Sequence, residues 1–243
     1  MNSKEYPMRI NKYLYREGIC SRREADRLIE KGQVKINGKR ALLGAKVSET
    51  DEVTLSKDAI KKTQNKKYYL LHKPKGVVSH NPQNGETSAE ELFEGAVRQL
   101  KLSPLGRLDK ASRGLMLFSN DGTIVDKLLN PKHEHEKEYV IEVDKRISKE
   151  FMDAFEQGVN IEGYKTKPAK VFKKSPRTCT VILTEGKKHQ LRRMCAALGY
   201  QVVDLKRVRI MDLRIGNLKP GQSREVKGLE LVNFMKSIGV MKK

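Results

Sequence analysis

A short, highly charged segment is the first place where this sequence could carry out chemistry. It reads Gly106-Arg107-Leu108-Asp109-Lys110 and precedes an apolar run at residues 115–118 that predicts a buried strand. Asp109 is flanked by basic residues, Arg113 among them, and this positive potential should keep its carboxylate ionised. Asp109 is therefore a candidate catalytic group. The same pattern also fits a loop aspartate in a surface ion-pair network, and the segment alone leaves both interpretations open.

Two later segments carry further candidates. Tyr139 follows Lys137-Glu138 and begins an apolar alternation that predicts a strand, so it is either a core tyrosine or part of a site. Residues 185–194 read EGKKHQLRRM, in which a Gly-Lys-Lys turn runs into a predicted helix. Arg192 and Arg193 lie near the first turn of this helix, and taken alone such a basic helix start predicts a phosphate contact only.

Motifs for metals and nucleotide cofactors are missing from the sequence. Residues 133–137 read HEHEK, which resembles a zinc-protease motif, but Lys137 stands where the second histidine would be required. Cys20, Cys179 and Cys195 are too dispersed for a zinc finger or a deaminase site. No phosphate-binding loop and no dinucleotide fingerprint is present. We therefore expect neither a metal nor an organic cofactor.

Composition indicates the class of partner. Lys and Arg outnumber Asp and Glu by 50 to 30 among 243 residues, which gives a net charge of +20 and a pI near 9.8. Such a surplus predicts a polyanionic partner, with nucleic acid the first candidate and an anionic membrane surface the second. No apolar run approaches the roughly 20 residues of a membrane-spanning helix. With no signal-peptide pattern and three scattered cysteines, we expect a cytoplasmic protein.

The N-terminal residues have the pattern of a small domain. Apolar residues recur at helical spacing in residues 9–18, and Ser21 followed by Glu24 is a capping-box signature for a second helix that ends at Gly32. An alternating run then reaches Asn37-Gly38, which is a strong hairpin signal.

Basic side chains gather on the second predicted helix and the hairpin. On composition alone they could form a solvated basic surface. The string RINKYL-REGICSRREADRLIEKGQVKINGK at residues 9–39, however, resembles the S4 RNA-binding domain over the whole module. The resemblance implies that the helix and hairpin hold structured RNA by contacts to its backbone. The residues expected to do so are Arg22, Arg23, Arg27 and Lys35.

The remainder of the chain predicts a second, larger domain. Residues 56–67 are Lys-rich and almost free of apolar residues, so we expect a linker there. Many short strands and a few helices follow without regular alternation, which indicates an α+β domain built on a largely antiparallel sheet. We expect an S4-like domain with its linker over residues 1–62 and a catalytic domain over residues 63–243.

Four segments of this second domain resemble the pseudouridine synthases. In chain order they are HKPKGVVS (72–79), GRLDKASRGLMLFSNDG (106–122), HEKEY (135–139) and HQLRRMCAALGY (189–200). Together with the S4-like segment they resemble the group named for RsuA and RluF, and most closely its members that modify large-subunit (23S) ribosomal RNA. Two positions depart from the pattern of the group. His72 stands where asparagine is usual, and His189 is more typical of RluA-type relatives.

The resemblance implies a reaction and gives Asp109 the central role in it. A pseudouridine synthase breaks the bond from ribose to N1 of a uracil and reattaches the base through C5. Nothing is added or lost, so no cofactor is needed, and the base must leave its stack before a side chain can reach the sugar. Asp109 would either attack C1′ or remove a proton from C2′. Both routes need the carboxylate form.

The resemblance also assigns roles to other residues. Arg192 would be the basic partner of Asp109, because a guanidinium fork suits a carboxylate. Tyr139 would stack on the flipped base and help to remove the proton from C5. Arg107 would fill the gap left in the RNA stack, Leu191 would pack against the base, and Lys110 would contact RNA.

Two other functions fit parts of the sequence. One is a non-catalytic ribosome-assembly protein whose S4 domain does all the binding. The other is an N-glycoside hydrolase that uses Asp109. A hydrolase would normally need a second placed carboxylate, and none of the three nearest candidates, Glu134, Glu136 and Glu138, is an evident mate.

Overall fold

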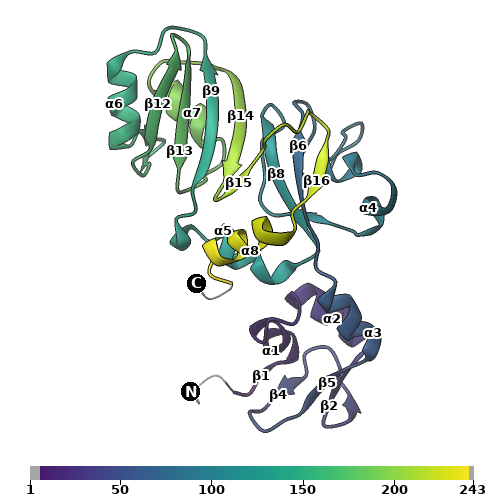
Figure 1. The fold of residues 1–243 in the computed structure, drawn as a ribbon. Helices are drawn as coiled ribbons and strands as arrows, with labels where there is room; N and C mark the ends of the chain where they lie inside the picture. Colours follow the sequence, from purple (N-terminus) through teal and green to yellow (C-terminus); the bar gives the residue numbers. More distant parts are fainter. Residues whose placement is uncertain (1–5, 241–243) are drawn as a thin grey trace. The chain divides into compact units, whose positions relative to one another are not determined.

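The computed structural model describes residues 6–240, which divide into two compact units (Figure 1). The first unit contains the chain up to Lys67 together with residues 120–125. The second contains residues 68–119 and the chain from Asp126 onward. The short return segment is joined to the first unit by hydrogen bonds, since the Lys67 N–H donates to Asn120 Oδ1 at 2.8 Å and Asn120 Nδ2 donates to the Asn65 carbonyl at 3.0 Å.

The first unit has the predicted order of helix, helix and hairpin. Its elements are β1 (Met8–Arg9), α1 (Ile10–Arg16), α2 (Arg22–Glu30), β2 (Val34–Ile36), β3 (Lys39–Arg40), β4 (Lys46–Val47) and β5 (Val53–Leu55). A three-stranded sheet has the order β3-β2-β5, and β1 pairs with β4. Ile10 and Leu14 of α1 pack with Leu28 and Ile29 of α2 in one small apolar core. The predicted S4-type domain is thus a folded unit with its own core.

Local sequence signals explain how these elements begin and turn. Ser21 Oγ accepts the Glu24 N–H at 3.3 Å and so caps α2, as predicted. Within residues 6–240 the Glu24 carboxylate pairs with Lys62 and Arg27 rather than with the Ser21 N–H, so only half of the capping box forms. Asn37 and the glycine after it have φ values of 50° and 76°, which suit a tight turn between β2 and β3.

The expected linker is mostly helical. Ser56 Oγ accepts the Ala59 N–H at 3.2 Å and caps α3 (Lys57–Gln64). Ala59 is completely buried in the core of the first unit. The segment predicted as a linker is therefore an ordered helix, which an N-cap and a buried alanine attach to the first unit while its lysines face solvent.

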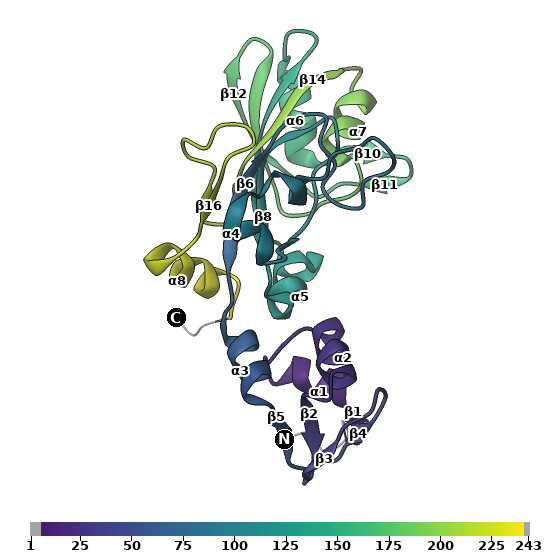
Figure 2. The same ribbon diagram turned by 90° about the vertical axis from the view of Figure 1, so that its right-hand side faces the viewer.

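The second unit is built on a nine-stranded sheet, which confirms the predicted α+β fold (Figure 2). The strand order is β12-β13-β9-β14-β8-β6-β16, with β15 beside β14 and β7 beside β8. Every pair is antiparallel except β14 with β8. The strands are β6 (Tyr68–Lys73), β7 (Ser103–Pro104), β8 (Arg113–Ser119), β9 (Lys137–Val143), β12 (Lys170–Ser175), β13 (Thr178–Leu183), β14 (Val202–Ile210), β15 (Leu213–Arg214) and β16 (Ser223–Glu225).

Helices complete the second unit. They are α4 (Gly95–Gln99), α5 (Val125–Leu129), α6 (Lys149–Gln157), α7 (Gln190–Ala197) and α8 (Gly228–Ser237), and a small hairpin pairs β10 (Asn160–Ile161) with β11 (Tyr164–Lys165). Phe151 and Phe155 of α6 share one core with Met194 of α7 and with Ile141 and Val181 of the sheet. Within residues 6–240 no helix is both long enough and apolar enough to cross a membrane.

The parallel pair β14–β8 joins two antiparallel halves of the sheet, and it depends on a glycine. Only two residue pairs form its register, Lys206 with Arg113 and Arg207 with Gly114. Gly114 has φ +116°, and a Cβ placed there would lie 2.2 Å from the Arg207 carbonyl oxygen. A side chain at position 114 would push the halves apart. This junction is where the candidate site lies.

Candidate active site

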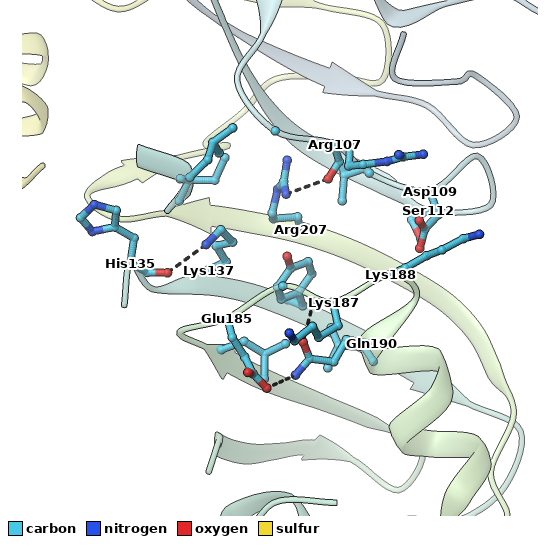
Figure 3. A pocket seen from close by; sticks show the side chains of 18 of the residues that line it. Arg107, Asp109, Ser112, His135, Lys137, Glu185, Lys187, Lys188, Gln190 and Arg207 are labelled. Carbon is cyan, nitrogen blue, oxygen red and sulfur yellow. Dashed lines mark hydrogen bonds between the residues drawn. The ribbon is translucent and has the colours of Figure 1, made fainter. Parts of the chain in front are cut away.

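A pocket of about 370 Å³ opens in the second unit where the two halves of the sheet meet (Figure 3). Its walls come from the loop before β8, from β9 and β14, and from the segment that leads into α7. The volume lies in the range of small-molecule sites. Five residues predicted from the sequence line it: Arg107, Asp109, Tyr139, Leu191 and Arg192. Segments far apart in the chain thus converge on one cavity.

The loop that carries Asp109 is held by hydrogen bonds to its backbone. The Leu108 N–H donates to Ser79 Oγ at 2.9 Å, and the Ser79 hydroxyl lies 2.6 Å from the Leu108 carbonyl. The Gly76 N–H donates to the Lys110 carbonyl at 2.9 Å, and the Ser112 N–H donates to the Asp109 carbonyl at 2.9 Å. Ser79 is buried, so its two bonds to Leu108 are shielded from water. The carboxylate therefore starts from a fixed backbone.

Arg207 supports the same loop from the neighbouring strand. It is only 4% exposed, and its Nε donates to the Leu115 carbonyl at 2.7 Å. Its Nη1 donates to the Arg107 carbonyl at 3.3 Å. Arg207 thereby ties β14 to β8 and to the Asp109 loop at once. The sequence analysis gave it no role, although a charged residue inside the apolar pattern of a strand is a visible signal.

The carboxylate of Asp109 faces a histidine. His189 Nε2 lies 3.3 Å from Asp109 Oδ1, and the Asp109 side chain remains 26% exposed. His189 precedes α7 with a left-handed backbone, at φ 53° and ψ 26°. That conformation is uncommon for a residue other than glycine, and it sets the ring at the mouth of the pocket. One of the two departures from the family pattern thus touches the candidate catalytic group.

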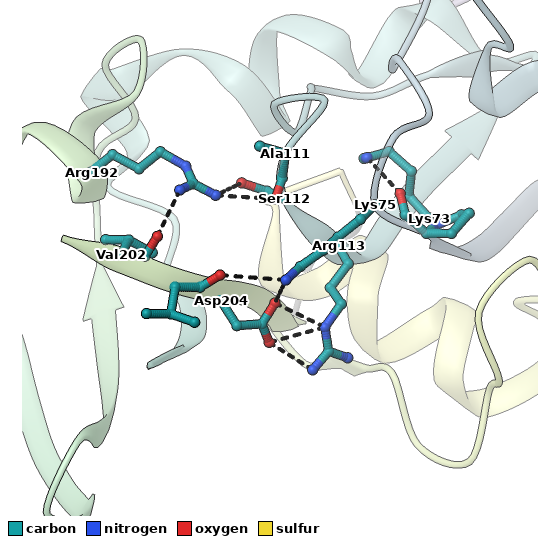
Figure 4. Close-up of polar contacts among 10 residues, drawn as sticks. Lys73, Lys75, Ala111, Ser112, Arg113, Arg192, Val202 and Asp204 are labelled. Atoms are coloured by element: carbon teal, nitrogen blue, oxygen red, sulfur yellow. Dashed lines mark hydrogen bonds and ion pairs between the residues drawn. The ribbon is translucent and has the colours of Figure 1, made fainter. Parts of the chain in front are cut away.

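Arg192 contacts Ala111, Ser112 and Val202 (Figure 4). Its Nη2 donates to the Ala111 carbonyl at 3.1 Å and lies 3.4 Å from Ser112 Oγ, while its Nη1 donates to the Val202 carbonyl at 3.3 Å. Among residues 6–240 the basic side chain within 4 Å of the Asp109 carboxylate is His189, so the expected pair of Arg192 with Asp109 is not formed here. Arg192 instead fixes the two residues that follow Lys110.

Tyr139 and Leu191 form apolar surface in the pocket. Tyr139 is 8% exposed on β9, and Leu191 is 5% exposed in the first turn of α7. Both belong to the core of the second unit, so their positions are fixed by packing. A flat ring and a branched apolar group beside a carboxylate form a surface on which a planar ligand can pack.

A buried glutamate shapes the segment that leads into α7. Glu185 is 5% exposed and accepts the Tyr164 hydroxyl at 2.6 Å, Gln190 Nε2 at 2.6 Å and the Lys167 N–H at 3.0 Å. Gln190 in turn accepts the Lys187 N–H at 2.8 Å. These contacts anchor both ends of the turn that presents His189. The contacts of Glu185 with Tyr164 and Lys167 join residues 21 and 18 positions apart, so no local pattern revealed them.

The HKPKGVVS segment has a positioning role that the sequence analysis did not assign. Lys73 is completely buried and donates to the Pro74 and Val77 carbonyls at 2.8 and 2.7 Å. Burial lowers the pKa of Lys73 to about 8, and the nearby Asp109 opposes that shift. His72, the other departure, is buried with Nδ1 2.7 Å from the Leu218 carbonyl. The segment thus closes the turn that supplies Gly76 and Ser79 to the Asp109 loop.

Arg113 contributes less to the field at Asp109 than the sequence suggested. Its guanidinium makes a forked contact with Asp204, with Nη2 2.7 Å from Oδ2 (Figure 4). Lys75 Nζ lies 2.7 Å from the other oxygen of Asp204. Burial raises the pKa of Asp204, but the hydrogen bonds from Arg113 and Lys75 outweigh it and hold that pKa below its usual value. The charge of Arg113 is therefore largely neutralised.

The residues predicted to bind RNA outside the pocket are exposed. In the first unit Arg22, Arg23, Arg27 and Lys35 all face solvent, and Arg27 Nη1 lies 3.4 Å from Glu24 Oε2. In the second unit Lys110 is exposed and pairs with Glu86 at 2.8 Å. Among the residues described, no group of three or more His, Cys, Asp or Glu is placed to hold a metal ion.

Comparison with known proteins decides the family. The sequence model of RNA pseudouridylate synthases matches residues 67–197, and that of the S4 domain matches residues 8–53. The chain belongs to the RNA pseudouridylate synthase family. It is 40% identical over 233 residues to the Escherichia coli K12 dual-specificity RNA pseudouridine synthase RluF, covering 95% of this chain and 79% of that one.

Other relatives agree. The Bacillus subtilis ribosomal large subunit pseudouridine synthase B is 36% identical over 226 residues, covering 90% of this chain and 91% of that protein. A crystal structure of a pseudouridylate synthase superposes with a TM-score of 0.69 at 27% identity and covers 95% of this chain and 99% of that one. The protein is an S4-containing pseudouridine synthase of the RluF and RluB type that acts on RNA.

Proposed function

We propose that this enzyme isomerises a uridine of 23S ribosomal RNA to pseudouridine, with Asp109 as its catalytic carboxylate. The observation that carries the proposal is the setting of Asp109. Its loop is fixed at Leu108, Asp109 and Lys110 by backbone hydrogen bonds, and its carboxylate faces a pocket of nucleoside size. A nucleophile or base must be held this firmly to meet one atom of a sugar.

The other residues of the pocket support this role by their positions. Tyr139 supplies a ring on which the flipped base stacks, and Leu191 packs against the edge of that base. Arg107 is exposed at the mouth of the pocket, where its guanidinium plane fills the gap that the flipped nucleotide leaves. Arg192 supplies positive charge near Asp109 from the Ala111 and Ser112 side, and His189 Nε2 lies 3.3 Å from the carboxylate.

Large-subunit ribosomal RNA is the substrate that the relatives favour. The Bacillus subtilis relative is named for the ribosomal large subunit, and the Escherichia coli relative is named as a dual-specificity enzyme. The exposed arginines and lysine of the S4 unit suit a structured RNA, since they can contact its phosphates without reading sequence. We propose that these contacts deliver one loop of 23S RNA to the pocket.

Unmodified transcripts test the substrate and the residue together. The enzyme is incubated with 23S RNA, 16S RNA and a transfer-RNA pool, and pseudouridines are mapped by carbodiimide labelling. We expect a new carbodiimide-reactive uridine in 23S RNA, no release of free uracil, and no product with Asp109→Asn. Modification of 16S RNA alone would overturn the substrate assignment. Normal turnover by Asp109→Asn would overturn the role of Asp109, and free uracil would indicate a hydrolase.

A further inference from the structure

Two positive side chains interrupt the core-facing side of the sheet at the pocket. Residues 137, 139, 141 and 143 alternate onto one face of β9, and Ile141 and Val143 are fully buried in the core. Lys137 begins this row at the end of β9, where the strand borders the pocket and not the core. On β14, Arg207 lies directly opposite Tyr139 in the register, and Leu205 lies opposite Ile141. Directly paired residues share a face, so Lys137 and Arg207 both point toward the pocket that they line.

Neither cation has a carboxylate partner among residues 6–240. Lys137 Nζ donates to the His135 carbonyl at 3.1 Å, which uses one of its three donors. Arg207 donates from Nε and Nη1 to two carbonyls, and its buried Nη2 has no hydrogen-bond partner. Placing two unneutralised cations in a partly desolvated pocket is unfavourable for folding. Unpaired cations that destabilise the fold are typical of functional sites, so we expect this pocket to accept an anion during function.

The carboxylates of the pocket are occupied elsewhere. Asp109 faces His189 at 3.3 Å, and Glu185 is held by Tyr164, Gln190 and the backbone of Lys167. In Figure 3, Lys137 and Asp109 lie on opposite sides of Arg207. Lys137 therefore lies at the end of the pocket away from Asp109.

The reaction generates an anion in this place. When the N1–C1′ bond breaks, its electron pair stays on the base, and the charge spreads over N1, O2 and O4. C5 then bonds to C1′, the C5 proton is lost, and N1 gains a proton, so that atoms and charge balance. The base turns about its C6–N3 axis between the two steps, which exchanges O2 with O4. A cation beside a ring carbonyl therefore meets an equivalent oxygen before and after the turn.

We propose that Lys137 is a catalytic residue whose ammonium group stabilises the departing uracil anion by a hydrogen bond to a ring carbonyl, with Arg207 supplying adjacent positive charge. This inference rests on the proposed role of Asp109, which sets the sugar at the opposite end of the pocket. Charge stabilisation of this kind acts only as the bond breaks, so it accelerates the chemical step rather than binding.

The setting of Lys137 also predicts a pH dependence. Burial, followed by the charge of Arg207, lowers the pKa of Lys137 to about 8. The role requires the protonated form, so it is present below that pKa and lost as pH rises through it. The other charged or titratable groups that line the pocket with Lys137 are Arg207 on β14, Tyr139 on β9, Arg107 and Asp109 on the loop before β8, Glu185, Lys187, Lys188 and His189 before α7, Arg192 in α7, and His135 beside Lys137.

Single-turnover kinetics with saturating enzyme test the proposal. Lys137→Met keeps an unbranched side chain of nearly the same length and removes its charge. We expect the rate of pseudouridine formation to fall about 100-fold, as when one oxyanion donor is lost. Lys137→Arg should recover part of the rate and abolish the decline above pH 8. Lys174→Met is the matched control, because Lys174 is exposed on β12 outside the pocket and its loss removes the same charge.

A modified substrate separates anion stabilisation from a structural role. Fluorine at C5 makes the uracil a better leaving group, so consumption of 5-fluorouridine RNA should depend less on Lys137. We expect the defect of Lys137→Met to shrink several-fold on that RNA. An equal defect on both RNAs, or an unchanged rate with uridine RNA, would overturn the proposal. Asp109→Asn is measured beside it: if that variant is inactive while Lys137→Met is normal, only the inference about Lys137 fails.

Discussion

The Asp109 loop and the basic surface of the S4 unit differ in how their functional side chains are held. Around Asp109, Ser79, Gly76 and Arg207 bind the backbone on both sides of the carboxylate, and most of these partners are buried. On the S4 unit, Arg22 and Arg23 extend into solvent from the first turn of α2. The Asp109 loop depends on the exact position of one side chain, whereas the S4 surface depends on the charge of several side chains.

This difference separates two ways in which the protein acts on RNA. Positioning a carboxylate against one sugar tolerates little displacement, so the loop is fixed before the substrate arrives. Phosphate contacts tolerate side-chain motion, because the attraction is long-ranged and is spread over many groups. Substitutions near Asp109 should therefore change rates, and substitutions on α2 should change affinity and its dependence on salt.

The largest effect after loss of Asp109 is expected at Arg192. Arg192→Lys keeps the charge but cannot reach Ala111, Ser112 and Val202 at once, so the loop after Asp109 shifts. We expect the single-turnover rate to fall about 100-fold, as for a displacement near 1 Å, with RNA affinity nearly unchanged. Arg193→Lys is the control, because Arg193 pairs with the exposed Glu162. If only the affinity for RNA changed, Arg192 would serve as a phosphate contact and would not position the loop.

A smaller effect is expected at Ser79. Ser79→Ala removes the acceptor of the Leu108 N–H and leaves a buried donor unpaired. The free energy of unfolding should fall by about 1–3 kcal/mol, and the rate should fall by less than in Arg192→Lys. Urea unfolding and single-turnover assays below the unfolding transition measure the two effects. Ser175→Ala, on an exposed position of β12, should change neither. Full activity of Ser79→Ala would show that the loop holds without this bond.

The smallest single effects are expected on α2. If about six phosphates are contacted, log K against log salt should have a slope on the order of −4 to −5. Arg22→Ala and Arg23→Ala should each flatten it by less than about one unit, with the single-turnover rate at saturation unchanged. Filter binding over a salt series measures the slope. A slope near zero for the intact protein would mean that its basic surplus does not bind RNA.

More of the S4 unit than of the pocket could be predicted from the sequence. The S4 unit depends on local signals, such as the cap at Ser21 and the turn at Asn37, and these predicted its elements well. Composition did not predict the helix after Ser56, where a buried alanine joins the core, and only half of the capping box at Ser21 forms.

The pocket depends on contacts that no local pattern contains. Motif resemblance predicted Asp109, Tyr139 and Leu191 as site residues, and the fold brings them to one cavity. The supports of the site could not be read in this way, because Ser79 binds a residue 29 positions away and Arg207 one 100 positions away. The contact of His189 with Asp109, in place of Arg192, likewise depends on how the segment before α7 is anchored.

One paired measurement tests the separation of position from charge most directly. Single-turnover rate and salt slope are determined for Asp109→Asn and for Arg22→Ala on the same 23S transcript. We expect Asp109→Asn to form no detectable pseudouridine and to keep the full salt slope, because it removes no cation. Arg22→Ala should keep the rate at saturation and lose part of the slope. Residual turnover by Asp109→Asn near that of the wild type, with its binding weakened instead, would contradict the central role given to this carboxylate.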